Sequence, residues 1–367
     1  MTQIPEQLRE RTAGARFLEL DGLRGIAAFT VILHHFCCMY DLKEKPYLLP
    51  LVAGHSAVLL FFVLSGFVLS LPFWNKGTFG RYDAYLVRRI FRIYVPYVAA
   101  VGLAAVGMLL VGEKHLPLAP WYYETWQHPL SFSMIRHHLM MSVSFEMNTA
   151  FWSLHYEMLM SILFPALLLV VRLIPFGVCE SLILILYGIS VTLLKHGIAD
   201  PLGLGGDVKF AMVFLFGALL ARHRAAIHRL WNRAGKLATG VFAVVSCMAY
   251  WGYVRSVTYR GHFPDAPEII LVLGAGGVLL SSLYSRRLSA FMKNRVAEYL
   301  GRVSYSLYLV HGTVLFFLVD VLYWKISWEW MLVLFVIVSL VLAHLFCVLI
   351  EEPALRVGKR LSAKLAK

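Results

Sequence analysis

Ten long apolar stretches divide this chain and leave only short segments between them. A helix of about 20 apolar residues is long enough to cross the hydrocarbon core of a bilayer. Hydrophobic residues make up 59% of the sequence and charged residues 15%, unlike a soluble domain. We therefore predict an all-α, polytopic integral membrane protein with about ten transmembrane helices. The predicted spans are residues 25–41, 52–73, 94–112, 151–171, 177–194, 208–221, 237–254, 266–284, 303–322 and 328–350.

The lysine and arginine residues between the spans predict the orientation of the bundle. Basic residues gather in cytoplasmic loops, and a cytoplasmic N-terminus places 25 of the 34 Lys and Arg residues on the cytoplasmic side. We therefore predict that both termini are cytoplasmic. The net charge of +13 is then mainly an orientation signal, and we expect the bilayer, not a nucleic acid, as the partner of this charge.

We predict one membrane domain, residues 21–353, between a cytoplasmic N-terminal segment (1–20) and a basic cytoplasmic tail (354–367). Basic and apolar residues alternate in segment 81–93, which predicts an amphipathic helix along the cytoplasmic surface. The predicted outer loop, residues 113–150, is rich in aromatic side chains, namely Trp121, Tyr122, Tyr123, Trp126 and His128. Side chains of this kind favour the membrane–water interface, so we predict that they anchor the loop there. The alternative is that they form a stacking surface for a sugar.

The first span carries an arginine near its start and a histidine eleven residues later. Eleven steps of about 100° make about three turns, so Arg24 and His35 share a helix face roughly 16 Å apart. A histidine in hydrocarbon is costly and marks a functional site by default. The alternative is a packing role, in which the ring bonds a backbone carbonyl or a serine.

Other polar groups are expected at compatible depths in the fourth and ninth spans. The predicted orientation places His35 beyond the midplane, Glu157 below the outer surface and His311 near mid-depth. We expect these three to converge on one cavity, where a neutral imidazole beside a carboxylate could deprotonate a hydroxyl. His34 is predicted to pack against a neighbour or to form a supporting hydrogen bond, and the role of His155 stays open.

A second cluster of charge is expected on the cytoplasmic side, where four arginines lie near Arg24, namely Arg81, Arg88, Arg89 and Arg92. Arg88 and Arg92 are four residues apart and share a helix face. Guanidinium groups bind phosphates through paired hydrogen bonds, although orientation by positive charge explains the cluster equally well. We find no glycine-rich nucleotide fingerprint and no zinc-ligand spacing, so we predict no metal site.

Taken in order, six motifs of the chain resemble those of the membrane-bound acyltransferase 3 family. The resemblance covers essentially the whole chain and makes residues 21–353 an acyltransferase 3 transmembrane domain. The motifs are LDGLRG at 20–25 with His35, FFVLSGF at 61–67, RRIFRIYVP at 88–96, WSL at 152–154 with Glu157, SYSLYLVH at 304–311 and EP at 352–353.

The resemblance implies an enzyme that moves an acyl group, usually acetyl, from cytoplasmic acyl-CoA to a hydroxyl. The acceptor is often a sugar of a surface polysaccharide, an exported glycan or a lipid-linked precursor. Acyl-CoA (acetyl-CoA) is then a donor substrate and not a tightly bound cofactor. The implied partners are a carbohydrate acceptor, the bilayer and glycan export machinery, and the implied location is the bacterial inner membrane.

The resemblance also implies roles for single residues. His35 is the catalytic residue, and we expect Glu157 to orient it or to stabilise its charge; a covalent acyl-histidine relay is the variant. Arg24, Arg88, Arg89 and Arg92 would hold the phosphates of CoA. Substrate-binding or supporting roles fall to Asp21, Trp152, Ser153, Tyr308 and His311.

A proton-coupled transporter or a flippase of glycans or lipid-linked intermediates is the alternative function. Intramembrane histidines and a carboxylate suit such proteins too. Many transporters, however, consist of two related halves, and we find no such halves in this sequence.

Overall fold

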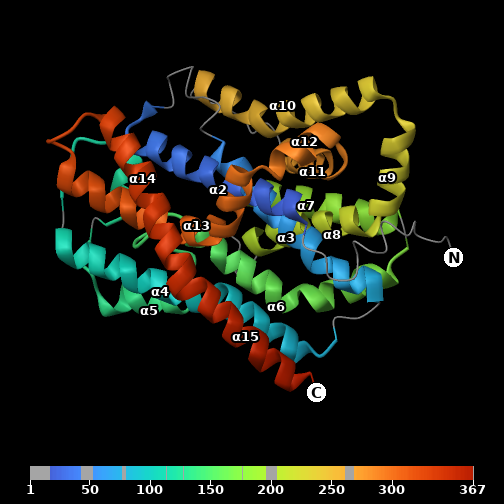
Figure 1. The fold of residues 1–367 in the computed structure, drawn as a ribbon, viewed down its shortest axis with the longest axis horizontal. Coiled ribbons are helices and arrows are strands. Elements are labelled where there is room, and N and C mark those ends of the chain that lie inside the picture. The colour runs from blue at the N-terminus through green and yellow to red at the C-terminus, as the bar shows by residue number, and fades with distance from the viewer. Residues whose placement is uncertain are drawn as a thin grey trace.

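The computed structural model describes residues 17–42, 53–76, 80–112, 114–126, 128–175, 177–195, 205–260 and 268–366. Every regular element in these ranges is helical, which confirms the predicted all-α class (Figure 1). The helices are α2 (Leu18–Met39), α3 (Gly54–Lys76), α4 (Tyr82–Val111), η3 (Pro120–Glu124), α5 (Phe132–Leu139), α6 (Trp152–Leu173), α7 (Val178–Lys195), α8 (Gly205–Arg222), α9 (Arg224–Arg233), α10 (Lys236–Arg260), α11 (Glu268–Tyr284), α12 (Arg286–Met292), α13 (Arg295–Leu322), α14 (Trp328–Phe346), η4 (Cys347–Glu351) and α15 (Glu352–Leu365).

Within the described residues, six helical segments are long and apolar enough to cross a membrane: α2, α3, α4, α6, α13 and the continuous run from α14 through α15. The pairs α8–α9 and α11–α12 bend by 63° and 92°, and counting each pair as one span raises the number to eight. The chain is thus a multi-pass integral membrane protein. Each of the ten predicted segments overlaps a helix, but the apolar parts of α7 and α10 are shorter. The count of ten and the cytoplasmic termini therefore stay predictions.

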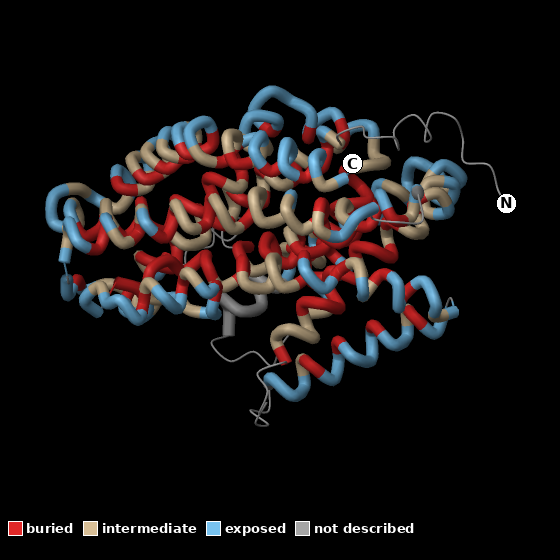
Figure 2. Tube along the Cα trace, turned by 90° about the horizontal axis from the view of Figure 1, so that it is seen from below, coloured by how far each residue is buried: buried red, intermediate tan, exposed pale blue. Residues whose placement is uncertain are grey.

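Three helices, α2, α3 and α13, form the centre of the bundle, and the others surround them. Their most apolar windows are 61%, 78% and 72% buried, whereas that of the α14–α15 segment is 28% buried. In Figure 2, the buried stretches of the chain, coloured red, run through the middle of the molecule. The surrounding helices α7 and α10 expose leucine, isoleucine and valine side chains. An apolar surface of this extent suits lipid, not water.

Glycines let α2 and α13 cross closely. A Cβ atom on Gly25 would collide with the backbone of Gly301, and a Cβ atom on Gly301 would collide with the carbonyl group of Asp21. Small residues at such a crossing let two membrane helices approach backbone to backbone. The crossing fixes the relative register of α2 and α13, which carry the two histidines described below.

Two predicted surface segments belong to the packed helices. Residues 81–93 were expected to form an amphipathic helix along the cytoplasmic surface. Residues 82–93 are helical, but they are the first turns of the 30-residue helix α4 and continue directly into the predicted span. The predicted tail forms most of α15, which packs along α4 with Gly358 against Phe91. The buried face of α15 consists of the small residues Ala354, Gly358 and Ser362, which lets the two helices lie close together.

The segment between α4 and α6 is fastened to the bundle by hydrogen bonds. The hydroxyl groups of Tyr94 and Tyr97 donate to the carbonyl oxygens of Leu139 and His138, each at 2.8 Å. The His138 ring is fully buried against Phe151, with 5.8 Å between the ring centroids. Neither nitrogen of the ring has a hydrogen-bond partner among the described residues. Burial lowers the pKa of His138 to about 4.

We therefore expect His138 to make the protein less stable in acid. An unfolded histidine titrates near 6.5, so between pH 6.5 and about 4 the unfolded chain takes up a proton that the folded chain does not. Stability then falls as the pH drops through this interval, by at most about 3 kcal/mol. His138→Leu removes this dependence. The test measures the apparent melting temperatures of wild type and His138→Leu in detergent at pH 7.5 and 4.5. An equal fall in melting temperature between the two pH values in both proteins would contradict the prediction.

Candidate active site

A cavity of about 150 Å³ opens between α2, α3, α4, α6 and α13. Three arginines (Arg24, Arg89 and Arg92) and one carboxylate (Glu157) line it. The rest of the wall combines apolar side chains with hydroxyl groups, namely Val58, Phe61, Phe62, Ser65, Val68, Leu69, Ile93, Ser153, Leu154, Ser304, Tyr305 and Tyr308. The cavity therefore offers positive charge and an apolar surface to the same ligand.

Glu157 is held by α3 and α4. Its carboxylate accepts from the guanidinium Nη2 of Arg89 at 2.8 Å and from the hydroxyl of Ser65 at 3.1 Å. Arg89 also donates through Nε to Ser161, one turn further along α6, at 3.0 Å. Both charged side chains are about 15% exposed. A pair this buried is stable only when further hydrogen bonds support it, and Ser65 and Ser161 supply two of them.

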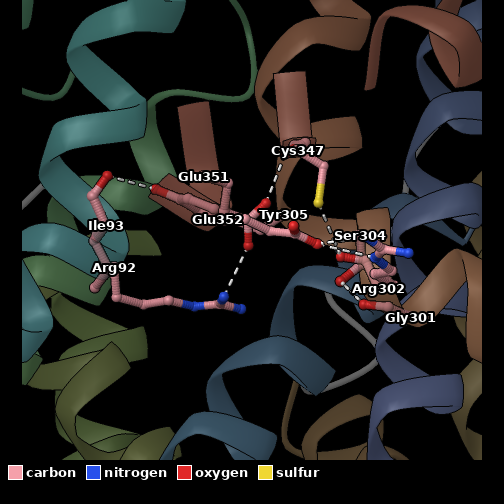
Figure 3. A network of polar contacts seen from close by, with 10 residues as sticks. Arg92, Ile93, Gly301, Arg302, Ser304, Tyr305, Cys347, Glu351 and Glu352 are labelled. Atoms are coloured by element: carbon pink, nitrogen blue, oxygen red, sulfur yellow. Dashed lines mark hydrogen bonds and ion pairs between the residues drawn. The ribbon is translucent and has the colours of Figure 1, made fainter. Parts of the chain in front are cut away.

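Arg92 is held by a carboxylate that the sequence analysis did not single out (Figure 3). Its Nη1 donates to Glu351 at 2.8 Å, and the other oxygen of Glu351 accepts from Ser306 at 2.6 Å. Glu351 is only 2% exposed and ends the π-helix η4. A π-helical turn changes the direction in which side chains point and is frequent at functional sites. The next residue, Glu352 of the quoted motif, instead binds the exposed Arg302 at 2.6 Å.

Arg24 differs from the other two arginines of the cavity. Arg89 and Arg92 each have a carboxylate partner, whereas Arg24 forms no hydrogen bond or ion pair with the residues that the structure describes. Three guanidinium groups thus face two carboxylates, and the cavity keeps an excess positive charge. Such a site attracts an anion.

Arg88 lies outside this arrangement. Its side chain is exposed and does not line the cavity, so the structure does not place Arg88 beside Arg92 in the cavity, and a phosphate-binding role for Arg88 stays a prediction. Arg89 and Arg92, three residues apart, share the inward face instead. Arg88 is about 100° from Arg89 around the helix axis, so it faces away from the cavity when Arg89 and Arg92 face it.

His35 and His311 meet where α2 and α13 pack together. The Nδ1 atom of His35 lies 2.9 Å from Nε2 of His311, and Nδ1 of His311 lies 3.1 Å from the carbonyl oxygen of Leu307. A carbonyl only accepts, so Nδ1 of His311 carries a proton and its Nε2 accepts when the ring is neutral. His35 must then donate through Nδ1, which leaves a lone pair on its Nε2. His311 is fully buried, whereas His35 is partly accessible.

The expected contact between His35 and Glu157 is not formed. The described hydrogen-bond partner of His35 is His311, and Glu157 is bound to Arg89 and Ser65. A buried carboxylate is stabilised more by an ion pair with a guanidinium group than by a hydrogen bond from a neutral imidazole. The structure therefore brings His311 to His35, as predicted, but brings Glu157 to the arginines.

Tyr308 lies between the cavity and the histidine pair. Its ring lines the cavity and lies 5.8 Å from the ring of His311, measured between centroids. Its hydroxyl is 2.7 Å from that of Ser153. This contact joins two predicted supporting residues from α6 and α13 at the inner end of the cavity.

The other predicted residues lie around this centre. Trp152 packs against Phe210, 5.7 Å between ring centroids, and does not line the cavity. Asp21 lies one turn before Arg24 on α2. His155, whose role the sequence left open, lies 2.7 Å from the carbonyl oxygen of Met141 and 3.5 Å from Asp207. These contacts are those of a residue that joins helices.

The fold and this site define a class: a multi-pass helical membrane protein in which a positively charged cavity adjoins a histidine pair. A family model described as an acyltransferase domain, that of the acyltransferase 3 family, matches residues 17–352. The chain belongs to this family and is an acyltransferase, so the predicted O-acyltransferase class is confirmed.

Two curated relatives are similar to parts of the chain. The first, "O-acetyltransferase PaAT-1" of Phomopsis amygdali, is 21% identical over 378 residues, which cover 81% of this chain and 71% of that protein. The second, "Protein 2 in picA locus" of Rhizobium radiobacter, is 34% identical over 104 residues. That match covers 28% of this chain and about half, 51%, of the relative. No solved structure matches the chain.

Proposed function

We propose that this protein transfers an acetyl group from acetyl-CoA to a hydroxyl group of a carbohydrate, in a bacterial inner membrane. The observation that carries the proposal is that two functional groups lie next to each other. Tyr308 lines a cavity whose Arg24 has no described partner, and the Tyr308 ring packs against His311, which in turn holds His35 with a lone pair on its Nε2. The name of the first relative supports an acetyl donor and an oxygen acceptor, and the carbohydrate follows from the family resemblance.

We assign acetyl-CoA to the cavity because the cavity is positively charged and CoA carries phosphate groups. Phosphate groups are anions that guanidinium groups bind by paired hydrogen bonds, and Arg24 has its donors free of any described partner. The apolar part of the wall, which includes Phe61 and Leu69, suits the pantetheine arm. Arg24 and His35 are roughly 16 Å apart along α2, a separation that an extended arm of CoA covers.

The proposed reaction is direct transfer with His35 as general base. Nε2 of His35 takes the proton of the acceptor hydroxyl while the hydroxyl oxygen attacks the thioester carbonyl. The tetrahedral intermediate then expels the CoA thiolate, which takes the proton from His35, and the products are an ester and free CoA. His311 keeps the proton on Nδ1 of His35 in both steps. Ser153 and Tyr308 share one hydrogen bond, so one of the two hydroxyl groups, now directed at the carbonyl oxygen of Ala150, can turn to donate to the oxygen that becomes negative.

A covalent acyl-histidine intermediate is the variant of this mechanism. In it, Nε2 of His35 attacks the thioester, CoA leaves, and the acceptor hydroxyl takes the acyl group in a second step. The two routes differ in steady-state kinetics. Intersecting lines with both substrates varied support direct transfer, whereas ping-pong kinetics support the relay.

The test of function measures ester groups on glycans. Cells that lack the gene receive wild type or His35→Ala, and the O-acetyl content of surface and secreted glycans is measured by NMR before and after mild alkali. We expect esters with the wild type and none with an equally expressed variant. Esters that are the same in all strains would refute a glycan acceptor. Loss of the surface glycan itself with His35→Ala would instead support the flippase.

A further inference from the structure

We propose that Trp121 forms the acceptor side of the active site, where it positions the acceptor hydroxyl against His35 and keeps water from it. This inference rests on the proposed function. Trp121 lies in η3, in the loop after α4. Its ring centroid is 5.2 Å from that of His35, with 37° between the ring planes. No other aromatic side chain outside α2 and α13 is in ring contact with His35 among the described residues.

Trp121 and the arginine cavity lie at opposite ends of the site. Arg24 is near the start of α2 and His35 is eleven residues further along. Likewise Arg89 and Arg92 lie near the start of α4, and the loop that carries Trp121 follows the end of that helix. Phe316, which also contacts Trp121 at 5.7 Å, lies two turns beyond Tyr308 on α13. A donor in the cavity therefore approaches His35 from the side opposite Trp121.

The loop around Trp121 is built to hold a fixed position. The hydroxyl of Tyr122, a fully buried side chain, donates to Asp320 at 2.7 Å, and the Tyr122 ring stacks on Phe316. The indole nitrogen of the buried Trp126 donates to the carbonyl oxygen of Met147 at 2.8 Å. Trp324, by contrast, is 77% exposed, as expected of a tryptophan that only anchors the protein at the membrane surface. Trp121 is thus part of the site and not simply of an interfacial belt.

Trp121 has the chemistry that a sugar requires. Its side chain is partly exposed, and its indole N–H donates no hydrogen bond to the residues that the structure describes. That group is free to donate to a hydroxyl oxygen of the acceptor. The negative face and positive edge of an aromatic ring also suit the C–H and hydroxyl groups of a carbohydrate. An apolar ring beside the base excludes water, which would otherwise compete with the acceptor for the acyl group.

Kinetics with purified protein test this role. The acceptor is surface glycan from cells that lack the gene, freed of esters by mild alkali, and the donor is acetyl-CoA. For Trp121→Ala we expect at least a tenfold rise of KM for the glycan, with KM for acetyl-CoA unchanged within twofold. Release of CoA without glycan should rise at least threefold, because water reaches His35. Trp121→Phe should keep most of the wild-type behaviour.

Trp324→Ala is the matched control, and we expect it to match wild type in all three measurements. An unchanged KM for the glycan in Trp121→Ala would overturn the inference. An equal rise of KM for the glycan and for acetyl-CoA would also overturn it, because the substitution would then have disturbed the structure of the whole site. If wild-type protein transfers no acetyl group to the glycan, the proposed function fails, whatever the variants do.

Discussion

Replacing His35 with alanine is expected to lower the rate of acyl transfer by at least a hundredfold, the largest effect of any single change in this protein. The reason is the free lone pair on Nε2, which no described hydrogen bond occupies. A positioned general base contributes about 10²–10⁴-fold to such reactions. The variant should still bind acetyl-CoA normally, because His35 does not line the arginine cavity. Activity close to wild type would refute the assignment of the base.

His311 acts through His35, and its substitution separates positioning from packing. His311→Gln keeps an acceptor oxygen near the place of Nε2, whereas His311→Leu removes the acceptor and leaves the Nδ1–H group of His35 without a partner. We expect a loss of about 10–100-fold with leucine, as for other residues that orient a functional histidine, and a smaller loss with glutamine.

The pH profile of transfer makes this test independent of folding. Without His311 the proton of His35 can move to Nε2, so the base is correctly protonated in only part of the molecules and the profile should change. A loss of activity with leucine and glutamine alike, with an unchanged pH profile, would mean that His311 only fills space.

The helices could be predicted from the sequence because apolar length is a local property. Each predicted span overlaps a helix, since any stretch of this composition satisfies its backbone hydrogen bonds only as a helix in lipid. The placement of Arg24 and His35 on one helix follows from helical geometry in the same way. What apolar length does not predict is a helix that begins in a polar segment, and α4 begins at Tyr82, well before the predicted span.

The partners within the site depend on contacts between helices, which the sequence does not reveal. Glu157 was assigned to His35 from depth alone, and the early start of α4 places Arg89 beside it instead. Glu351 was missed because two adjacent glutamates look equivalent in the sequence. Only the π-helix η4 turns Glu351 inward to Arg92, while Glu352 binds Arg302. Depth did predict that His35 and His311 converge, but it did not predict that they form a hydrogen bond with each other.

Substitutions of Arg24 and Arg89 are expected to differ, although both arginines line the same cavity. Arg24→Ala should raise KM for acetyl-CoA by about 10–100-fold, the effect of losing one or two hydrogen bonds to a charged group. It should leave the melting temperature unchanged or slightly higher, because Arg24 has no ion-pair partner among the described residues and lies close to two other positive charges. Arg88→Ala, an exposed neighbour of the cavity arginines, should alter neither quantity.

Arg89→Ala should weaken both donor binding and the fold. Removing it leaves the buried carboxylate of Glu157 with Ser65 as its remaining described partner, and breaking a buried ion pair costs about 3–5 kcal/mol. The double variant Arg89→Met with Glu157→Leu removes both charges and should recover much of this stability without recovering donor binding. Thermal unfolding in detergent and KM for acetyl-CoA separate the two effects. If Arg24→Ala destabilised the protein as much as Arg89→Ala, Arg24 would be a structural residue and the anion site would lose its main support.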